Sequence, residues 1–152
     1  MARKHNISLV IAVSVLFLIA VHPSVARAQG RELTAERIAE RIAPAVVEIL
    51  VNGRMSGSGA IISQTGIVAT AAHVMPNQDA TIEVLMFDNK RIPVSVHAKD
   101  AGHDVLLLKM QSRTEGYPHL LPAKRPLTTG SRVYMSGTPL FRHRLLFTGI
   151  VA

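Results

Sequence analysis

Short apolar segments separated by clusters of turn-forming residues dominate this chain from Ala45 onward. Residues 81–87 are typical, because Ile82, Val84 and Met86 alternate with side chains directed to the opposite side. A spacing of two is the repeat of a β-strand, in which successive side chains point to opposite faces of a sheet. Many short strands at such intervals predict an all-β sandwich or barrel.

The chain of 152 residues is long enough for one domain, and 48% hydrophobic against 18% charged residues predicts a packed globule. Ile92, Val94 and Val96 are expected to point into the core, and the continuous apolar run at 105–110 predicts a strand buried on both faces or between lobes. The predicted strands are 46–51, 57–63, 67–72, 81–87, a strand beginning at Ile92, 105–110, 132–135 and 145–151.

A short helix is predicted before these strands, over residues 31–43. Its apolar residues Ala35, Ile38, Ala39 and Ile42 recur at helical spacing, Thr34 is a suitable N-cap and Pro44 ends the helix. A helix this short is marginal alone, so its apolar face is expected to pack on the barrel. Between the strands, residues 113–130 contain three prolines and form a polar linker.

The N-terminus has the pattern of a secretory signal peptide over residues 1–28. Arg3 and Lys4 are its basic region, residues 7–21 its apolar region, and Ala26-Arg-Ala28 its cleavage site. The apolar region is shorter than the roughly 18 residues of a membrane-spanning helix. The sequence therefore predicts export, a mature chain beginning at Gln29 and no stable membrane span after cleavage; an uncleaved anchor is the alternative.

The composition narrows the function further. The chain has no cysteine, so no disulfide can stabilise it in an oxidising compartment. Its basic residues are scattered singly or in pairs without aromatic residues between them, which argues against a nucleic acid partner.

Three motifs stand together in the strand region. Gly57-Ser-Gly59 enters one strand, Thr70-Ala-Ala-His73 ends the next, and Asp104 begins the strand that runs apolar into Lys109. This combination resembles the first half of a trypsin-like serine protease, closest to the bacterial HtrA/Deg branch. The resemblance implies a chymotrypsin-like double β-barrel, with a complete first barrel at 45–112 after the N-terminal region 29–44, and an incomplete second barrel at 131–152.

The same resemblance implies a mechanism. His73 falls on the general base and Asp104 on the acid that orients it, so that Nδ1–H of the imidazole is held and Nε2 can take a proton from a hydroxyl. The nucleophilic serine, which this family carries in Gly-x-Ser-Gly-Gly, is absent from these 152 residues. The implied protein is an exported, periplasmic or secreted bacterial endopeptidase that acts on polypeptides without a cofactor, with an oligomer possible and a PDZ module undetermined.

The sequence departs from the family pattern at two positions and contains other candidate sites. Val74 stands where trypsin has a disulfide cysteine, and Leu106 replaces a small alanine. His97 and His103 suggest metal, but no zinc-ligand spacing is present. Ser58 belongs to the glycine-rich strand entry, where small residues allow close packing.

Ser136-Gly-Thr-Pro-Leu140 echoes a nucleophile loop. It has Met135 and Thr138 where that loop has Asp and Gly, and it follows Asp104 too closely. Two explanations of the missing serine remain. The chain is the N-terminal part of a longer enzyme, or it is a catalytically dead secreted half-protease that acts as a binding or structural module. Strands with unpaired edges favour the first.

Overall fold

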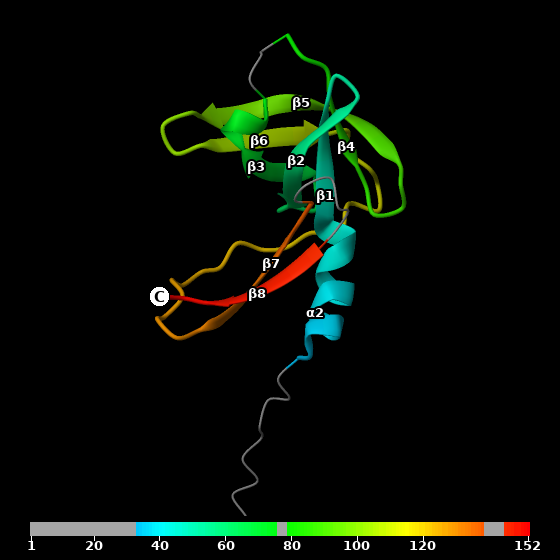
Figure 1. Ribbon diagram of the computed structural model, residues 1–152. Coiled ribbons are helices and arrows are strands. Elements are labelled where there is room, and N and C mark those ends of the chain that lie inside the picture. The colour runs from blue at the N-terminus through cyan, green and yellow to red at the C-terminus, as the bar shows by residue number, and fades with distance from the viewer. Residues whose placement is uncertain (1–32, 76–78, 139–144) are drawn as a thin grey trace, which may run out of the picture. The chain divides into compact units, whose positions relative to one another are not determined.

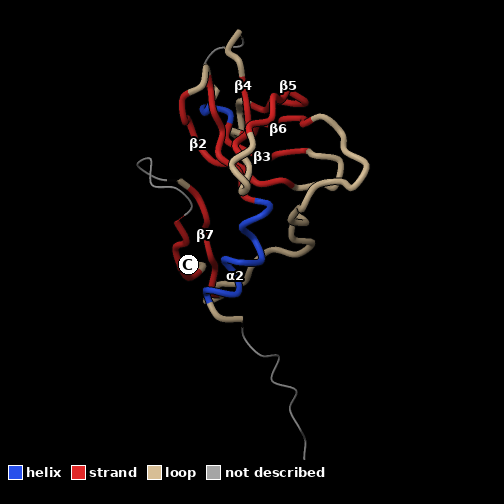
Figure 2. Tube along the Cα trace, turned by 90° about the vertical axis from the view of Figure 1, so that its right-hand side faces the viewer, coloured by secondary structure: helices blue, strands red, loops and turns tan. Residues whose placement is uncertain are grey.

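The computed structural model describes residues 33–75, 79–138 and 145–152. The expected signal peptide therefore lies outside the described residues. Strands are the main regular structure of the described chain and the helical segments are short (Figure 2). Six strands make one sheet: β1 Val46–Val51, β2 Arg54–Ile61, β3 Ile67–Ala71, β4 Ile82–Leu85, β5 Arg91–Asp100 and β6 Val105–Met110 (Figure 1).

These six strands close into a barrel in the order β1-β2-β3-β6-β5-β4, and every neighbouring pair is antiparallel. Strands β1 and β2 are joined by Asn52 and Gly53, whose φ angles are 51° and 74°. Positive φ at both positions is what a tight two-residue hairpin of matching twist requires, and Asn-Gly is the preferred pair. The hairpin places Gly59 of β2 opposite Val47 of β1.

The inward-facing side chains of the barrel form its core. Ile82, Val84 and Met86 are buried, as the alternation predicted, while Ile92 and Val94 are partly buried against the core. The expectation for Val96 was wrong, because this side chain is 46% exposed. The pairing of β5 with β6 shifts register between Val96 and Ala98, and a bulge of this kind breaks the alternation of faces.

Strand β6 is fully buried on one face only, so the expectation that both of its faces are buried was wrong. Leu106, Leu108 and Met110 are fully buried, whereas Val105 is 42% exposed. A strand in a closed barrel has one face toward the core, so continuous apolar sequence does not guarantee burial on both sides. Strand β1 instead is buried on both faces, and its Glu48 is the one fully buried charged side chain among the described residues.

The observed helix is shorter than the one predicted over residues 31–43. Helix α2 spans Ala35–Ile42, and the Thr34 hydroxyl accepts a hydrogen bond from the Arg37 N–H, as an N-cap does. A 3₁₀ turn, η1 Ala43–Ala45, carries Pro44 and leads into β1. No residue of α2 is fully buried. The helix is therefore packed less closely than was expected.

The remaining strands, β7 Arg132–Gly137 and β8 Leu145–Ile150, form a separate antiparallel sheet of two strands. The connection before them runs along the barrel: the Tyr117 and Leu120 N–H groups donate to the Gln64 and Ile61 carbonyls, and Tyr117 is buried. The closed barrel, partial second sheet and short helix confirm the predicted all-β, chymotrypsin-like fold class.

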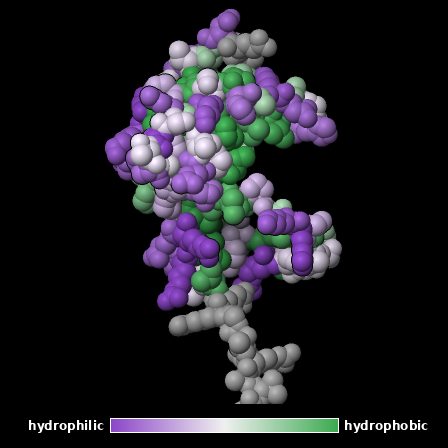
Figure 3. Space-filling model, turned by 180° about the vertical axis from the view of Figure 1, so that it is seen from behind, coloured by the Kyte–Doolittle hydropathy of each residue, from purple (hydrophilic) through white to green (hydrophobic). Residues whose placement is uncertain are grey.

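Apolar side chains remain open to solvent on parts of the surface (Figure 3). On the two-stranded sheet they include Met135, Phe147 and Ile150, with exposed fractions of 66%, 41% and 72%. Met135 pairs with Phe147 across the two strands. Within residues 33–75, 79–138 and 145–152, no helix has the length and apolar character needed to cross a membrane.

Candidate active site

A single turn after strand β3 carries His73. The strand ends at Ala71, and the chain then forms the 3₁₀ turn η2, Ala72–Val74. Ala72 and Val74 are buried on either side of the histidine, while the His73 side chain is 75% exposed. The turn is therefore anchored by its small and apolar neighbours, and it presents the imidazole at the surface.

Asp104 lies across from this turn, immediately before β6. Its φ of 54° is in the left-handed region, where aspartate is among the few non-glycine residues found with any frequency. Strands β3 and β6 pair here, with Ala71 opposite Val105. Two residues 31 positions apart in the sequence are brought together because each stands at the end of one of these paired strands.

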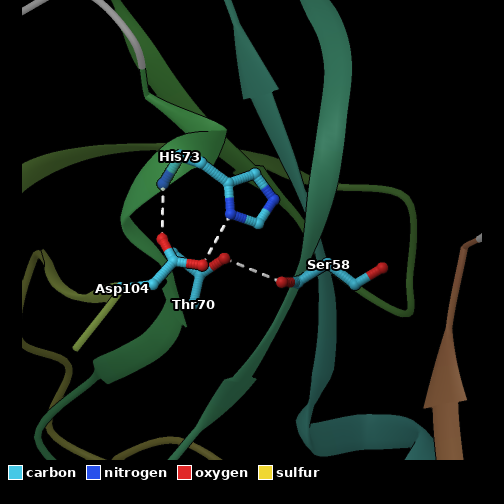
Figure 4. Close-up of polar contacts among 4 residues, drawn as sticks. All are labelled: Ser58, Thr70, His73 and Asp104. Carbon is cyan, nitrogen blue, oxygen red and sulfur yellow. Dashed lines mark hydrogen bonds and ion pairs between the residues drawn. The ribbon is translucent and has the colours of Figure 1, made fainter. Parts of the chain in front are cut away.

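Three hydrogen bonds join Asp104 to the turn, and Figure 4 shows the two that involve His73. Its Oδ2 lies 2.7 Å from His73 Nδ1, its Oδ1 accepts the His73 backbone N–H at 2.9 Å, and its carbonyl accepts the Ala72 N–H at 3.1 Å. A carboxylate can only accept, so the Nδ1 atom carries the proton. The second ring nitrogen, Nε2, is then an acceptor on the far side of the ring.

The hydrogen bond from the His73 side chain holds the pKa of the Asp104 carboxyl below its ordinary value, and the His73 backbone N–H acts in the same direction. Both bonds favour the charged carboxylate. The pair is open to water, with the Asp104 side chain 51% exposed. The arrangement supplies an oriented imidazole with an accepting nitrogen, which is the chemistry of a general base.

Ser58 does not supply a hydroxyl to this base. Its Oγ accepts the Thr138 N–H at 2.8 Å, and its side chain points away from the imidazole (Figure 4). The Ser58 carbonyl accepts a hydrogen bond of 2.8 Å from the Thr70 hydroxyl. This bond links β3 to β2 three residues before His73. Thr138 also donates to the buried carboxylate of Glu48, at 3.3 Å.

Ser136 is also separate from the pair. It lies within β7, opposite Leu146, and lines a hollow of about 260 Å³ together with residues that include Val46 and Phe87. A different hollow of about 260 Å³ lies beside His73 and Asp104, and Lys99 forms part of its wall. Among the described residues, no serine or threonine hydroxyl is hydrogen-bonded to the His73 ring.

The sequence reasoning missed a second imidazole–carboxylate contact, between Asp100 and His103. Asp100 Oδ2 lies 2.7 Å from His103 Nδ1, and Oδ1 accepts the His103 N–H at 3.1 Å. The His103 side chain is the main cause of a lowered pKa of the Asp100 carboxyl. The spacing of three residues in the β5–β6 turn was the available signal. Because this pair is formed within one turn, it stabilises that turn without linking two strands.

Metal ligation was the alternative for the histidines. His103 is engaged with Asp100, and His97 is exposed on β5. Within the described part of the chain, no three side chains of histidine, aspartate or glutamate are grouped as metal ligands.

Comparison with known proteins identifies the family of this chain. The family model of the trypsin-like peptidase domain matches residues 57–152. The chain is 31% identical over 125 residues to human serine protease HTRA4 and 30% identical to serine protease HTRA1 of Xenopus tropicalis, with 76% of this chain covered in each case. It is 29% identical over 99 residues to the mitochondrial serine protease HTRA2 of Drosophila pseudoobscura pseudoobscura, with 64% of this chain covered.

The matches leave much of each relative uncovered, since the chain spans 26%, 27% and 23% of their respective lengths. The family match includes Gly57-Ser-Gly59 of β2, the turn that carries His73, and Asp104 immediately before β6. With the closed barrel and the matched domain in agreement, the chain belongs to the trypsin-like peptidase family and is similar to its HtrA-type serine proteases.

Proposed function

We propose that this chain carries the base and the orienting acid of an exported serine endopeptidase that cleaves polypeptides by acyl transfer. His73 is the general base and Asp104 orients it. The observation that carries the proposal is the two-point contact between them: one carboxylate oxygen holds Nδ1–H at 2.7 Å and the other holds the backbone of the same residue at 2.9 Å.

This contact supports a base for a physical reason. Holding the Nδ1 proton fixes the tautomer, so that Nε2 is the atom available to take a proton from an attacking hydroxyl. The carboxylate then stabilises the imidazolium that forms. The backbone bond adds orientation, because a rotation of the turn would break two contacts with Asp104 at once.

The nucleophilic serine is proposed not to be among these 152 residues. Ser58 and Ser136 are the two candidates in the sequence. The Ser58 hydroxyl accepts the Thr138 N–H, and Ser136 lies within β7, so neither is hydrogen-bonded to His73. Without a hydroxyl on Nε2 the base has nothing to activate. An oxyanion hole and a substrate pocket would likewise come from residues other than those described.

The test is to read the coding DNA downstream of the Ala152 codon for Gly-x-Ser-Gly-Gly in any frame and to express the longer product. Casein cleavage should be present. His73→Ala should lower kcat/KM by about 10⁶-fold and Asp104→Asn by about 10⁴-fold. The matched control is His103→Ala, which removes an imidazole from a contact of the same geometry and should leave kcat/KM close to wild type.

Loss of activity in His103→Ala with retention in His73→Ala would contradict the assignment. If the downstream DNA encodes no Gly-x-Ser-Gly-Gly motif, the second candidate is supported. This candidate is a secreted binding or structural module without catalytic activity. The apolar side chains exposed on β7 and β8 are the observation that favours this candidate, because they offer a surface for association.

Export is proposed from the signal-peptide pattern of residues 1–28. A bacterial periplasmic or extracellular location is proposed because an exported chain without cysteine has no disulfide to stabilise it.

A further inference from the structure

The position of His73 depends on one short turn, and Asp104 holds only the first part of it. All three of the bonds from Asp104 reach Ala72 or His73. The turn ends at Val74, and among the described residues a backbone bond from the Met75 N–H to the Ala72 carbonyl, at 3.3 Å, closes it. The exit of the turn therefore needs a second anchor if the imidazole is to keep its orientation.

Strand β2 provides that anchor through Ser56. The Ser56 hydroxyl donates to the Val74 carbonyl at 2.7 Å, in a partly buried position. This short bond joins two residues that lie 18 positions apart, and it ends on the residue directly after His73. The Val74 side chain is buried, so its backbone cannot move outward without exposing apolar surface.

The adjacent Gly57 leaves room for the Val74 side chain against β2. A Cβ atom at this position would lie 2.7 Å from Val74 Cγ2 and 3.3 Å from Cγ1. Valine has a branched and stiff side chain, so it cannot rotate away at small cost. Gly57 thus allows the Val74 side chain to lie directly against β2, while Ser56 binds the carbonyl of the same residue.

We propose that Ser56 and Gly57 are positioning residues that act on His73 through Val74. They fix the exit of the turn as Asp104 fixes its entrance, and together the two anchors set the direction of the imidazole. The inference rests on the proposed function in one respect, namely that His73 serves as the base. Neither Ser56 nor Gly57 contacts the ring itself.

The test uses the 152-residue protein labelled with ¹⁵N. Two readouts report the turn: amide hydrogen exchange at His73 and Met75, and the ¹⁵N shifts of the His73 ring, which show which nitrogen carries the proton. Ser56→Ala should accelerate exchange at both amides about three- to tenfold, as expected for the loss of one hydrogen bond. It should also reduce the fraction of His73 protonated at Nδ1.

Ser56→Thr keeps the hydroxyl and should restore both readouts toward wild type. Gly57→Ala should disturb them more than Ser56→Ala, because it displaces Val74. The matched control is Gly59→Ala, the same substitution two residues along β2, where a Cβ would meet Ala69, Val68 and Ile49 of the barrel and not the turn. Gly59→Ala should lower stability and leave both His73 readouts unchanged in the folded protein.

Wild-type readouts in Ser56→Ala would overturn the proposal, whether or not Gly57→Ala folds. Equal disturbance by Gly59→Ala would also overturn it, since the effect would then be general loss of stability. Failure of the proposed function has a different signature: if wild-type His73 is not protonated at Nδ1, the base assignment fails before any change at Ser56 is made.

Discussion

Replacing Gly59 with alanine should destabilise the barrel, because β2 passes the core there without room for a side chain. A Cβ atom would lie 2.9 Å from the Ala69 carbonyl oxygen, 2.9 Å from Val68 Cγ1 and 3.2 Å from Ile49 Cδ1. Real Cβ atoms do not approach other heavy atoms closer than 3.0 Å. The carbonyl belongs to the backbone of β3, so it cannot rotate away, and the two strands must separate locally.

The expected loss follows from this crowding. An extra methyl group forced into a packed core costs about 1–3 kcal/mol. Alanine loses less backbone entropy than glycine on folding, which offsets about 0.5–1 kcal/mol of this cost. With two contacts below 3.0 Å, the net free energy of unfolding should fall by about 2 kcal/mol, and Tm by roughly 5–15 °C.

Urea titration followed by far-UV circular dichroism measures this loss. Gly53→Ala is the control: its φ is +74° and no atom lies within 4 Å of the added Cβ, so only backbone strain of about 1–2 kcal/mol is expected. If Gly59→Ala lies within about 0.5 kcal/mol of wild type, the close packing of β2 against β3 is refuted.

Four further outcomes are expected. Because the pKa of Asp104 is lowered, its contact with His73 stabilises the fold fully above the ordinary carboxyl pKa, and this stability is lost as pH falls through the lowered pKa. A ¹³Cγ titration of Asp104 should show the lowered pKa. In His73→Ala the pKa of Asp104 should move back toward its ordinary value. Leu108→Ala should cost about 2–5 kcal/mol in urea unfolding, since Leu108 is fully buried in β6. Intact mass of exported protein should correspond to a chain beginning at Gln29, and a mass that retains residues 1–28 would count against the signal peptide. The 152-residue chain should neither digest casein nor react with a fluorophosphonate; labelling that disappears in Ser136→Ala would make Ser136 the nucleophile.

The sequence predicted the strands well where local pattern decides them. The bounds of β1 and β6 match the predicted 46–51 and 105–110, and the Asn-Gly hairpin follows from its own turn preference. The error at Val96 has a tertiary cause, because the bulge in β5 depends on its pairing with β6. Likewise, β5 extends to Asp100 through polar residues that alternation alone does not mark as strand.

The contact between His73 and Asp104 was predictable from the sequence, but its detailed geometry was not. The motifs around His73 and Asp104 indicated a pair, but the left-handed backbone of Asp104 and its second bond to the His73 N–H come from the packing of β3 on β6. The anchor from Ser56 to the Val74 carbonyl joins two segments that share no pattern. Burial of Glu48 was also unpredictable, since an acidic residue in a strand is ordinarily expected on the solvent side.

The most direct test of the account is the tautomer of His73 in the 152-residue protein, read from the ¹⁵N shifts of its ring in wild type and in Asp104→Asn. The account predicts protonation at Nδ1 and a bare Nε2 in the wild type, because Asp104 Oδ2 accepts from Nδ1 at 2.7 Å. Asp104→Asn should remove this preference. A wild-type ring protonated at Nε2, or one that Asp104→Asn leaves unchanged, would contradict the assignment of His73 as a base held by Asp104.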